Sequence, residues 1–465
     1  MKIAFHGAAR AVTGSKHLLK LNNGTQILLD CGLFQGMGDV TDQLNESFGF
    51  NPEQINYLIL SHAHIDHCGL LPRLVAEGFS GSIFCTPATK DLAEILLLDS
   101  AKIQMQDAEY ANRKIKRVED QEMPLYNDKD VAQTLRQFKT IPYEQDFKIN
   151  PDISVRFTDA GHIVGSAAVH LQLNEDGKET HLTFSGDVGR YGDLLLKSPQ
   201  AFRQADYIIM ESTYGDSLHA DLEPIENMLG KIITQTCLEK KGKVIIPAFS
   251  VGRTQELLYA LNALELKGTL PDVPYYVDSP LSLEATAVLK NHPEVYNNGV
   301  KEILKIDRDI FGFKGLRFIE SSEESKAINS DPRPSVIISS SGMAEGGRVR
   351  HHIRNNISDH KNTILMVGYA SPGSLAGRLM SGQKRVWLFG QEYDVIAEVK
   401  SIQSMSAHGD YEDLLKFLSA QDPAKVKQLF LVHGEYDVQQ KFAVKVRDAG
   451  FKNVAIPSYH QEFEL

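Results

Sequence analysis

The sequence lacks any apolar run near the roughly 18 residues that a membrane-spanning helix requires. Its few cysteines form no C-x-x-C pair, and an even count in so long a chain carries no disulfide signal, so we expect buried, reduced thiols. No apolar block follows the N-terminal lysine, which is unlike a secretory signal. These absences predict a cytoplasmic protein without a membrane partner. The cysteines are Cys31, Cys68, Cys85 and Cys237.

A basic excess is also missing. The 49 Lys and Arg residues face 60 Asp and Glu residues, which gives a net charge of -11. This balance argues against broad nucleic-acid affinity by bulk electrostatics, but it leaves room for local basic grooves. With 42% apolar and 23% charged residues, the chain has the composition of a soluble globular protein. Its 465 residues exceed one hydrophobic core and predict about two or three domains.

Two kinds of pattern alternate along the chain. Short β-like segments fill residues 1–215, apart from a helix-like stretch at about 88–138. Within 216–397, apolar strands precede a Gly/Ser loop and then a helix, as in KVIIPAFSVGRTQELLYAL. Repetition of this unit predicts a parallel sheet flanked by helices. Residues 398–465 return to short strand and loop motifs, so we predict an α/β protein with boundaries near 215 and 397.

The densest chemical signal is HAHIDH at residues 62–67. His62 and His64 project the same way on an extended segment, and Asp66 and His67 follow where the chain can turn back. Imidazole and carboxylate groups suit zinc, and manganese also accepts them. This run can serve two metal ions from one loop, which predicts a two-metal hydrolytic site.

One loop cannot complete two coordination spheres, so we expect ligands from other strand ends. His162 in TDAGHIVG, Asp187 in TFSGDVGR and His433 in QLFLVHGE each lie beside glycine, which lets backbone approach closely. Asp187 could bridge two ions through its two oxygens. Asp30, at the end of TQILLD, fits better as a carboxylate that holds a ligand histidine than as a ligand.

Two further residues look catalytic rather than coordinating. His408 lies in SAHGD and Glu211 lies in MESTYGD. If they meet in the fold, the carboxylate would orient the imidazole and raise its pKa, which keeps a proton available for a leaving group. The pair therefore predicts acid catalysis.

HAHIDH resembles the H-x-H-x-D-H signature of the metallo-β-lactamase superfamily. The remaining motifs of that superfamily and of its β-CASP group of nucleic-acid nucleases are matched, in order, by Asp30, His162, Asp187, Glu211, His408 and His433. The resemblance covers nearly the whole chain. The sequence is similar to prokaryotic relatives of the endonuclease subunit of the eukaryotic pre-mRNA cleavage and polyadenylation machinery. It implies an αββα metallo-β-lactamase sandwich of segments 1–215 and 398–465, with an inserted parallel-sheet β-CASP domain at 216–397.

The resemblance also implies the roles of the site residues. Two zinc ions per chain, with manganese as an alternative, would activate the water that hydrolyses a phosphodiester bond. His408, Glu211 and Asp66 form the implied catalytic centre, and cleavage leaves 5′-phosphate and 3′-hydroxyl ends. One metal would take His62, His64, His162 and Asp187; the other would take Asp66, His67, Asp187 and His433.

Substrate preference follows from the same resemblance. A histidine at the last motif goes with RNA substrates in that family, whereas DNA-directed relatives tend to carry valine, so His433 favours RNA. The sequence shows no KH-type extension before its first motif and no long assembly domain after His433, and we therefore expect endonucleolytic cleavage. The sequence leaves a homodimer open.

The inserted segment contains candidate residues for binding the RNA backbone. A serine-glycine loop stands between a strand and an expected helix, where amide groups can hold phosphate. Arg253 in SVGRT and Arg378 in LAGRL occupy similar positions. The loop residues are Ser339, Ser340, Ser341 and Gly342.

Three other functions compete with a ribonuclease. A thioesterase or lactonase of the same superfamily would explain HAHIDH but not the large insert or SAHGD. A DNA-directed β-CASP nuclease would use the same metal ligands. A non-catalytic RNA-processing scaffold is disfavoured because every ligand position is filled in this sequence.

Overall fold

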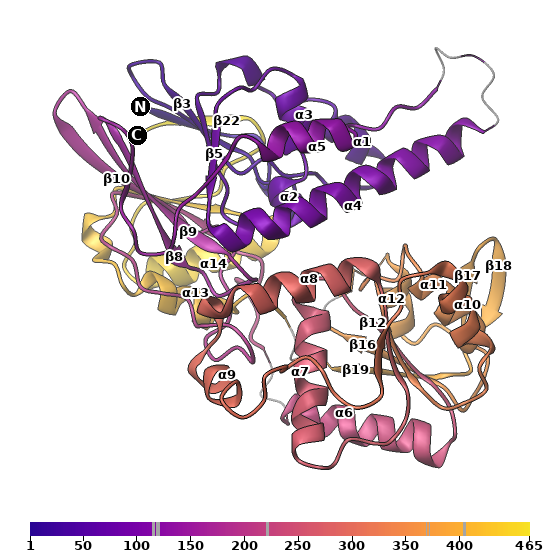
Figure 1. Ribbon diagram of the computed structural model, residues 1–465. Helices are drawn as coiled ribbons and strands as arrows, with labels where there is room; N and C mark the ends of the chain where they lie inside the picture. The colour runs from indigo at the N-terminus through magenta and orange to yellow at the C-terminus, as the bar shows by residue number, and fades with distance from the viewer. Residues whose placement is uncertain (114–116, 118–120, 220–222, 369, 372, 403–405) are drawn as a thin grey trace. The chain divides into compact units, whose positions relative to one another are not determined.

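A computed structural model of the chain describes residues 1–113, 117, 121–219, 223–368, 370–371, 373–402 and 406–465. The helix-like stretch at about 88–138 therefore falls partly outside the described residues. The chain divides into two compact units (Figure 1). Unit 1 contains Met1–Leu218 and His408–Leu465, and unit 2 contains His219–Ala407.

Unit 1 is built on two seven-stranded sheets. The first has the order β22-β1-β2-β3-β4-β5-β6 and the second has the order β21-β20-β11-β10-β9-β8-β7. The first sheet consists of β1 (Lys2–Phe5), β2 (His17–Lys20), β3 (Gln26–Leu29), β4 (Tyr57–Ile59), β5 (Ser82–Cys85), β6 (Phe138–Thr140) and β22 (Gln461–Glu464). The second consists of β7 (Phe147–Asn150), β8 (Ile153–Asp159), β9 (Ala167–Glu175), β10 (Lys178–Phe184), β11 (Tyr207–Glu211), β20 (Gln428–Val432) and β21 (Val454–Ala455).

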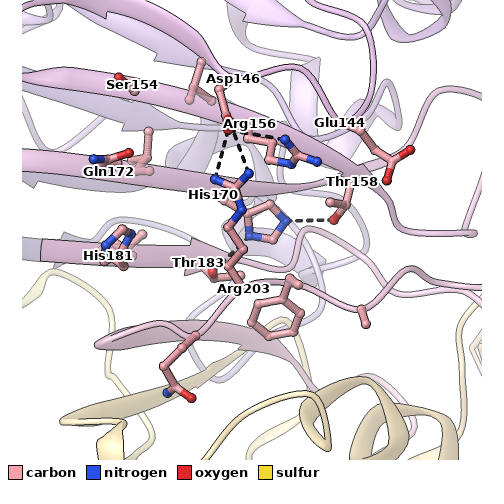
Figure 2. Close-up of a pocket in the computed structure, with 16 residues that line it drawn as sticks. Glu144, Asp146, Ser154, Arg156, Thr158, His170, Gln172, His181, Thr183 and Arg203 are labelled. Atoms are coloured by element: carbon pink, nitrogen blue, oxygen red, sulfur yellow. Dashed lines mark hydrogen bonds and ion pairs between the residues drawn. The ribbon is translucent and has the colours of Figure 1, made fainter.

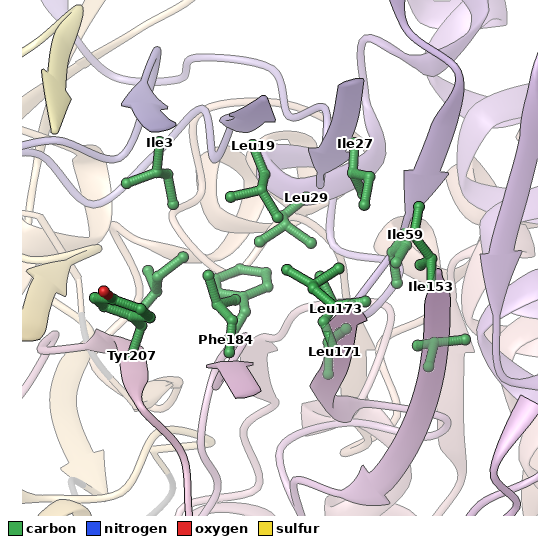
Figure 3. Packing of buried hydrophobic residues seen from close by; sticks show 14 of the residues in the cluster. Ile3, Leu19, Ile27, Leu29, Ile59, Ile153, Leu171, Leu173, Phe184 and Tyr207 are labelled. Atoms are coloured by element: carbon green, nitrogen blue, oxygen red, sulfur yellow. The ribbon is translucent and has the colours of Figure 1, made fainter. Parts of the chain in front are cut away.

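The inner faces of the two sheets share one apolar core (Figure 3). Side chains alternate between the faces of a strand, so every second residue enters this core. In β11, Ile209 joins it, whereas Ile208 and Met210 face the helices on the other side. The core includes Ile3, Leu19, Ile27, Leu29, Ile59, Ile153, Leu171, Leu173, Phe184 and Tyr207.

Helices complete the outer layers of unit 1. The outward residues of β11 and β20 pack against α13 (Tyr411–Leu418) and α14 (Tyr436–Asp448). On the other side, α4 (Pro87–Asn112) contacts β6 and the shorter helices α2 (Ile65–Cys68) and α5 (Asp128–Leu135). The predicted αββα sandwich is confirmed. Among the described helices, none combines the length and the apolar character that a membrane crossing requires.

Unit 2 contains a six-stranded sheet in the order β14-β13-β15-β12-β16-β19, and every neighbouring pair is parallel. The predicted parallel sheet is therefore confirmed. Its four central strands are fully buried, as expected where helices cover both faces. The strands are β12 (Val244–Pro247), β13 (Tyr275–Asp278), β14 (Leu316–Phe318), β15 (Val336–Ser339), β16 (Thr363–Val367) and β19 (Glu398–Ile402).

The surrounding elements of unit 2 are helices and one hairpin. The helices are α6 (Ile225–Ile233), α7 (Arg253–Leu266), α8 (Pro280–Asn291), α9 (Asn298–Ile303), α10 (Ser322–Ser330), α11 (Val349–Asn356) and α12 (Leu375–Met380). The hairpin pairs β17 (Arg385–Leu388) with β18 (Gln391–Asp394).

One boundary differs from the expected position near residue 397. Strand β19 follows that residue, yet it pairs with β16 and forms the edge of the unit 2 sheet. The chain rejoins unit 1 at His408. The charged sequence EVKSI gave no sign of membership in a buried sheet, because an edge strand contacts solvent and needs few apolar residues.

We predict that Leu171→Ala lowers the free energy of unfolding of unit 1 by about 2–5 kcal/mol, because it removes fully buried side-chain atoms and leaves a cavity between the sheets. Leu98→Ala, on the exposed side of α4, should change it by no more than about 0.5 kcal/mol. Urea unfolding followed by circular dichroism measures both, and equal losses would contradict this account of the core.

Candidate metal centre

The candidate ligands lie where strands of both sheets end. His62 follows β4, and His162, Asp187 and His433 follow β8, β10 and β20. Strands β10, β11 and β20 are parallel, and β8 runs the same way because two antiparallel pairings separate it from β10. Their carboxyl ends therefore share one edge of unit 1.

A first donor group contains His62, His64, His162 and Asp187. His64 Nδ1 lies 3.2 Å from His62 Nε2 and 3.1 Å from His162 Nε2. Asp187 Oδ2 lies 3.5 Å from His62 Nε2 and 3.6 Å from His162 Nε2. Tetrahedral ligands at bonds of about 2.0–2.1 Å stand about 3.3 Å apart, so these four donor atoms are spaced to surround one ion.

A second donor group lies on the other side of Asp187. It contains Asp66, His67 and His433. Asp66 Oδ2 lies 3.2 Å from His433 Nε2 and 3.9 Å from His67 Nε2. Asp187 Oδ1 lies 3.4 Å from His67 Nε2 and 3.6 Å from His433 Nδ1. The structure thus brings together all seven residues that the sequence singled out as ligands.

Asp187 connects the two groups through different oxygens. Its Oδ2 faces the first group, and its Oδ1 faces the second. Within the described part of the chain, neither Asp187 Oδ1 nor His67 Nε2 has a hydrogen-bond partner, although both atoms are buried. Buried polar atoms are normally satisfied, and an imidazole and a carboxylate that point into one space are ligands for a divalent metal ion. The donor set fits such an ion.

The charges of the donor groups depend strongly on one another. Burial alone would raise the pKa of Asp187, but the neighbouring imidazoles of His433, His67 and His62 hold it well below its usual value. Burial lowers the pKa of His62 well below its ordinary value, and the nearby His67 adds to that effect. Both shifts favour the ionised carboxylate and the neutral imidazole, which are the forms that bind metal.

Asp30 contacts the ligand loop rather than the donor space. Its Oδ2 lies 2.6 Å from His67 Nδ1, so it fixes the ring that presents Nε2 to the donor group. Ser61 donates to Asp30 through both its backbone N–H and its hydroxyl, each at 2.8 Å. The Ser61 hydroxyl also lies 3.0 Å from His62 Nδ1. Asp30 is therefore placed to hold a ligand histidine in orientation.

Tight backbone packing places the loop. A Cβ on Gly32 would stand 1.6 Å from the Asp66 carbonyl oxygen, so only glycine allows the strand end after β3 to lie against HAHIDH. His433 itself has a left-handed backbone with φ 49°, and its N–H donates to Ala8 O at 2.7 Å. Such backbone strain costs about 1–3 kcal/mol and is characteristic of functional sites.

Glu211 and His408 meet beside the first donor group. His408 Nδ1 lies 3.1 Å from Glu211 Oε1 and 4.0 Å from Asp187 Oδ2. Glu211 is fully buried and also accepts the Val188 N–H at 2.6 Å. Burial would lower the pKa of His408, but Glu211 raises it to about 9. The imidazole therefore keeps its proton at neutral pH, as acid catalysis requires.

The candidate RNA-contacting residues lie in unit 2, at the carboxyl end of its parallel sheet. The Ser339 hydroxyl is buried and donates to Asp278 O at 2.8 Å, and Ser340 donates to the Ser279 hydroxyl at 3.0 Å. Ser341 accepts the Gly346 N–H at 3.4 Å. A Cβ on Gly342 would meet the Phe249 ring at 2.8 Å. The loop is thus held by neighbouring strand ends.

The two arginines proposed to contact the RNA backbone differ in how free they are to bind a phosphate. Arg253 begins α7 but is only 7% exposed, and its guanidinium is paired with Glu256. Arg378 lies on α12, donates to Gly373 O at 2.7 Å and has Glu345 at 3.6 Å. Arg253 is therefore bound within the unit, while Arg378 is the more accessible of the two.

Sequence reasoning missed three polar residues of these sites. Thr213 Oγ1 lies 3.0 Å from His433 Nδ1 and orients that ring. Ser61 supports both Asp30 and His62, as described above. Ser279 caps α8 and links Ser340 to Ser250. Ser61 directly precedes HAHIDH, and its position next to the ligands was a usable signal. Thr213 lies two residues after Glu211 in MESTYGD, but nothing in that motif indicates its partner His433, which is distant in sequence.

Comparison with known protein families gives three matches. Residues 18–181 match the metallo-beta-lactamase superfamily domain, and residues 254–379 match the Beta-Casp domain. Residues 392–457 match the Zn-dependent metallo-hydrolase RNA specificity domain. Together with the buried donor set, these matches define a metal-dependent hydrolase.

Similar proteins cover most of the chain. Ribonuclease TTHA0252 of Thermus thermophilus is 34% identical over 94% of this chain and 93% of its own length. Transcription termination factor FttA of Methanosarcina mazei is 31% identical over 98% of this chain and 70% of its own length. RNase J-like protein of Methanocaldococcus jannaschii is 29% identical over 98% of this chain and 97% of its own length. The chain belongs to the β-CASP group of the metallo-β-lactamase superfamily, and its predicted class, a metal-dependent nuclease, is confirmed.

A solved structure supports the fold alone. A protein of unknown function from Enterococcus faecalis aligns with 100% of this chain and 99% of its own, with a TM-score of 0.56 at 12% identity.

We predict that Asp30→Asn weakens divalent-metal binding by about 10- to 100-fold, because the amide has one acceptor oxygen instead of two and cannot accept both the Ser61 N–H and the His67 Nδ1 proton, so the His67 ring is held less firmly. Asp176→Asn, at an exposed turn between β9 and β10, is the matched control and should bind metal normally. Competition with a chromophoric zinc chelator measures both affinities. Equal affinities in the two variants would show that Asp30 does not orient the ligand.

Proposed function

We propose that the protein is a zinc-dependent endoribonuclease that hydrolyses RNA phosphodiester bonds and leaves 5′-phosphate and 3′-hydroxyl ends. The observation that carries the proposal is the pair Glu211–His408, which lies beside Asp187 at the centre of the donor groups. A metal-binding site without a neighbouring proton donor would suit many hydrolases. A protonated histidine next to the donors suits a reaction in which a poor leaving group must be protonated.

Two ions would be held by the two donor groups, with Asp187 shared between them. When bound, they would supply an activated water and neutralise charge on the phosphate. The imidazole and carboxylate ligands are those that zinc prefers. Asp30, Ser61 and Thr213 keep the ligand rings in place before substrate arrives.

His408 acts on the leaving group in this proposal. Its Nδ1–H donates to Glu211, so its ring is fixed and the proton for the departing 3′ oxygen comes from Nε2. Glu211 is positioned in turn by the Val188 and Thr213 backbone N–H groups, at 2.6 and 3.2 Å. These hydrogen bonds hold the carboxylate beside the imidazole, whose protonated form it favours.

RNA is the proposed substrate for two reasons. Residues 392–457 match a domain described by its RNA specificity, and two of the similar proteins are named ribonucleases. We further propose that the serine-glycine loop 339–342 and Arg378 contact the RNA backbone, because loop amides at a strand end can hold phosphate. Arg253 is a weaker candidate, since Glu256 already neutralises it.

We predict that His408→Ala lowers kcat for RNA cleavage by about 100- to 10,000-fold through loss of the general acid, while metal content stays unchanged. His181→Ala removes a comparable pair, in which His181 lies 2.8 Å from Glu179 at the surface, and serves as the control. Single-turnover kinetics and elemental analysis give the two readouts. A His408 variant with the activity of the control would refute acid catalysis by this residue.

We also predict that the zinc-loaded protein opens a circular single-stranded RNA and produces 5′-phosphate ends, whereas Asp187→Ala leaves the circle intact because both donor groups lose a shared ligand. Gel mobility detects opening, and a 5′-phosphate-dependent exonuclease identifies the ends. Cleavage confined to linear RNA, ends with 2′,3′-cyclic phosphate, or faster cleavage of matched DNA would each contradict the proposal. Metal analysis should give about two zinc ions per chain.

A further inference from the structure

A basic and aromatic surface lies on unit 2, where α11 meets the turn of the β17–β18 hairpin (Figure 1). Phe389, at that turn, has an exposed fraction of 44%. The His351 ring stacks on it, with ring centroids 4.5 Å apart and an interplanar angle of 26°. The Cζ atoms of Arg350 and Arg354 lie 4.7 and 5.4 Å from the centroid of the same ring. We call Arg350, His351, Arg354 and Phe389 the Phe389 patch.

The two arginines of the patch carry uncompensated charge. Arg350 donates to Glu345 O at 3.2 Å and Arg354 to Asn355 Oδ1 at 3.4 Å, and neither forms an ion pair with any described carboxylate. Nearby Arg385 differs, since Glu392 and Asp394 lie within 3.4 and 3.2 Å of its guanidinium. In a chain with a net charge of -11, two unneutralised guanidinium groups on one helix form a local site for an anion.

The electrostatic environment agrees with this geometry. Burial lowers the pKa of His351, and the neighbouring Arg354, His352, Arg350 and Lys326 lower it further. The patch thus combines a partly exposed aromatic ring with two guanidinium groups. It is typical of surfaces that bind unpaired bases by stacking and phosphates by charge.

The hairpin exposes a second aromatic residue close in sequence. Trp387, the single tryptophan of the chain, has an exposed fraction of 64% and stands opposite Glu392 in the hairpin. The buried residues of β17 are Val386 and Leu388, which pack into the unit 2 core. Val386 and Leu388 supply the contribution of this strand to the core. The packing of unit 2 therefore gives no reason for Trp387 and Phe389 to be aromatic.

We propose that the Phe389 patch binds a single-stranded segment of RNA, with a base packed against the exposed part of the Phe389 and His351 rings and phosphates held by Arg350 and Arg354. The inference rests on the proposed ribonuclease function and adds an RNA contact outside the donor groups. Helix α11 begins at Val349 and is joined to the loop 339–342 by residues 343–348, so the patch extends the proposed backbone contacts toward the hairpin.

The first test measures affinity apart from cleavage. In the Asp187→Ala background, fluorescence anisotropy follows binding of a fluorescein-labelled unstructured RNA at several salt concentrations. Removing two phosphate contacts with Arg350→Gln and Arg354→Gln should reduce the slope of log K against log salt by about 1.4. The matched control Arg385→Gln changes the same charge on the same unit, but its guanidinium is already paired, so the slope should stay unchanged.

The second test addresses stacking. Phe389→Ala should weaken binding of single-stranded RNA by about 5-fold or more, Phe389→Tyr should restore it, and binding of duplex RNA should be unaffected. Fluorescence of Trp387 reports contact at the hairpin directly, and we expect quenching by the single strand. Thermal unfolding of each variant confirms that the unit remains folded.

The outcomes separate the patch from the function. If the wild-type protein cleaves RNA while all patch variants bind it like the control, the patch inference is overturned and the nuclease stands. If the variants instead change only the oligomeric mass, the surface binds a second copy and the inference is equally overturned. Absence of RNA cleavage by the wild-type protein would overturn the proposed function and the inference together.

Discussion

The carboxylate of Asp187 has to serve two groups of buried imidazoles at once. Its two oxygens face in different directions, so each group has one Asp187 oxygen at a distance suited to sharing a metal ion with its imidazoles. The donors come from loops after strands of both sheets, and those strands can end at one edge only if the sheets pack face to face in the correct register. The apolar core between the sheets is therefore a condition for the site as well as for stability.

This arrangement also places a limit on the protein without its metal. Several imidazoles and a carboxylate are held out of water, and Asp187 Oδ1 and His67 Nε2 have no hydrogen-bond partner among the described residues. Leaving such groups unsatisfied destabilises the fold, and metal binding would offset this cost. Hydrogen bonds from Asp30, Ser61 and Thr213 keep the rings oriented in the meantime. Metal affinity and the stability of this edge of unit 1 are consequently coupled.

Much of the site could be predicted because its strongest signals are local. HAHIDH concentrates ligands in one loop, and His433 stands beside glycine after an apolar strand. Thr213 could not be predicted, because its role depends on a partner brought close only by the pairing of β11 with β20. The parallel sheet of unit 2 followed from the repeated strand, loop and helix pattern. Its edge strand β19 did not, because an exposed edge needs no apolar sequence, and the pairing of Arg253 with Glu256 leaves no trace in a motif.

The pairing of β1 with β22 has a consequence for synthesis. These strands come from opposite ends of the described chain, and the Leu465 N–H donates to Met1 O at 2.9 Å. Unit 2 is contiguous, so its sheet can form while the last part of the chain is still being made. The loop at His62 is synthesised early, but the second donor group lacks His433 until that residue, far later in the sequence, has also been made. A growing chain therefore carries the first ligand loop well before it carries the donor that completes the second group.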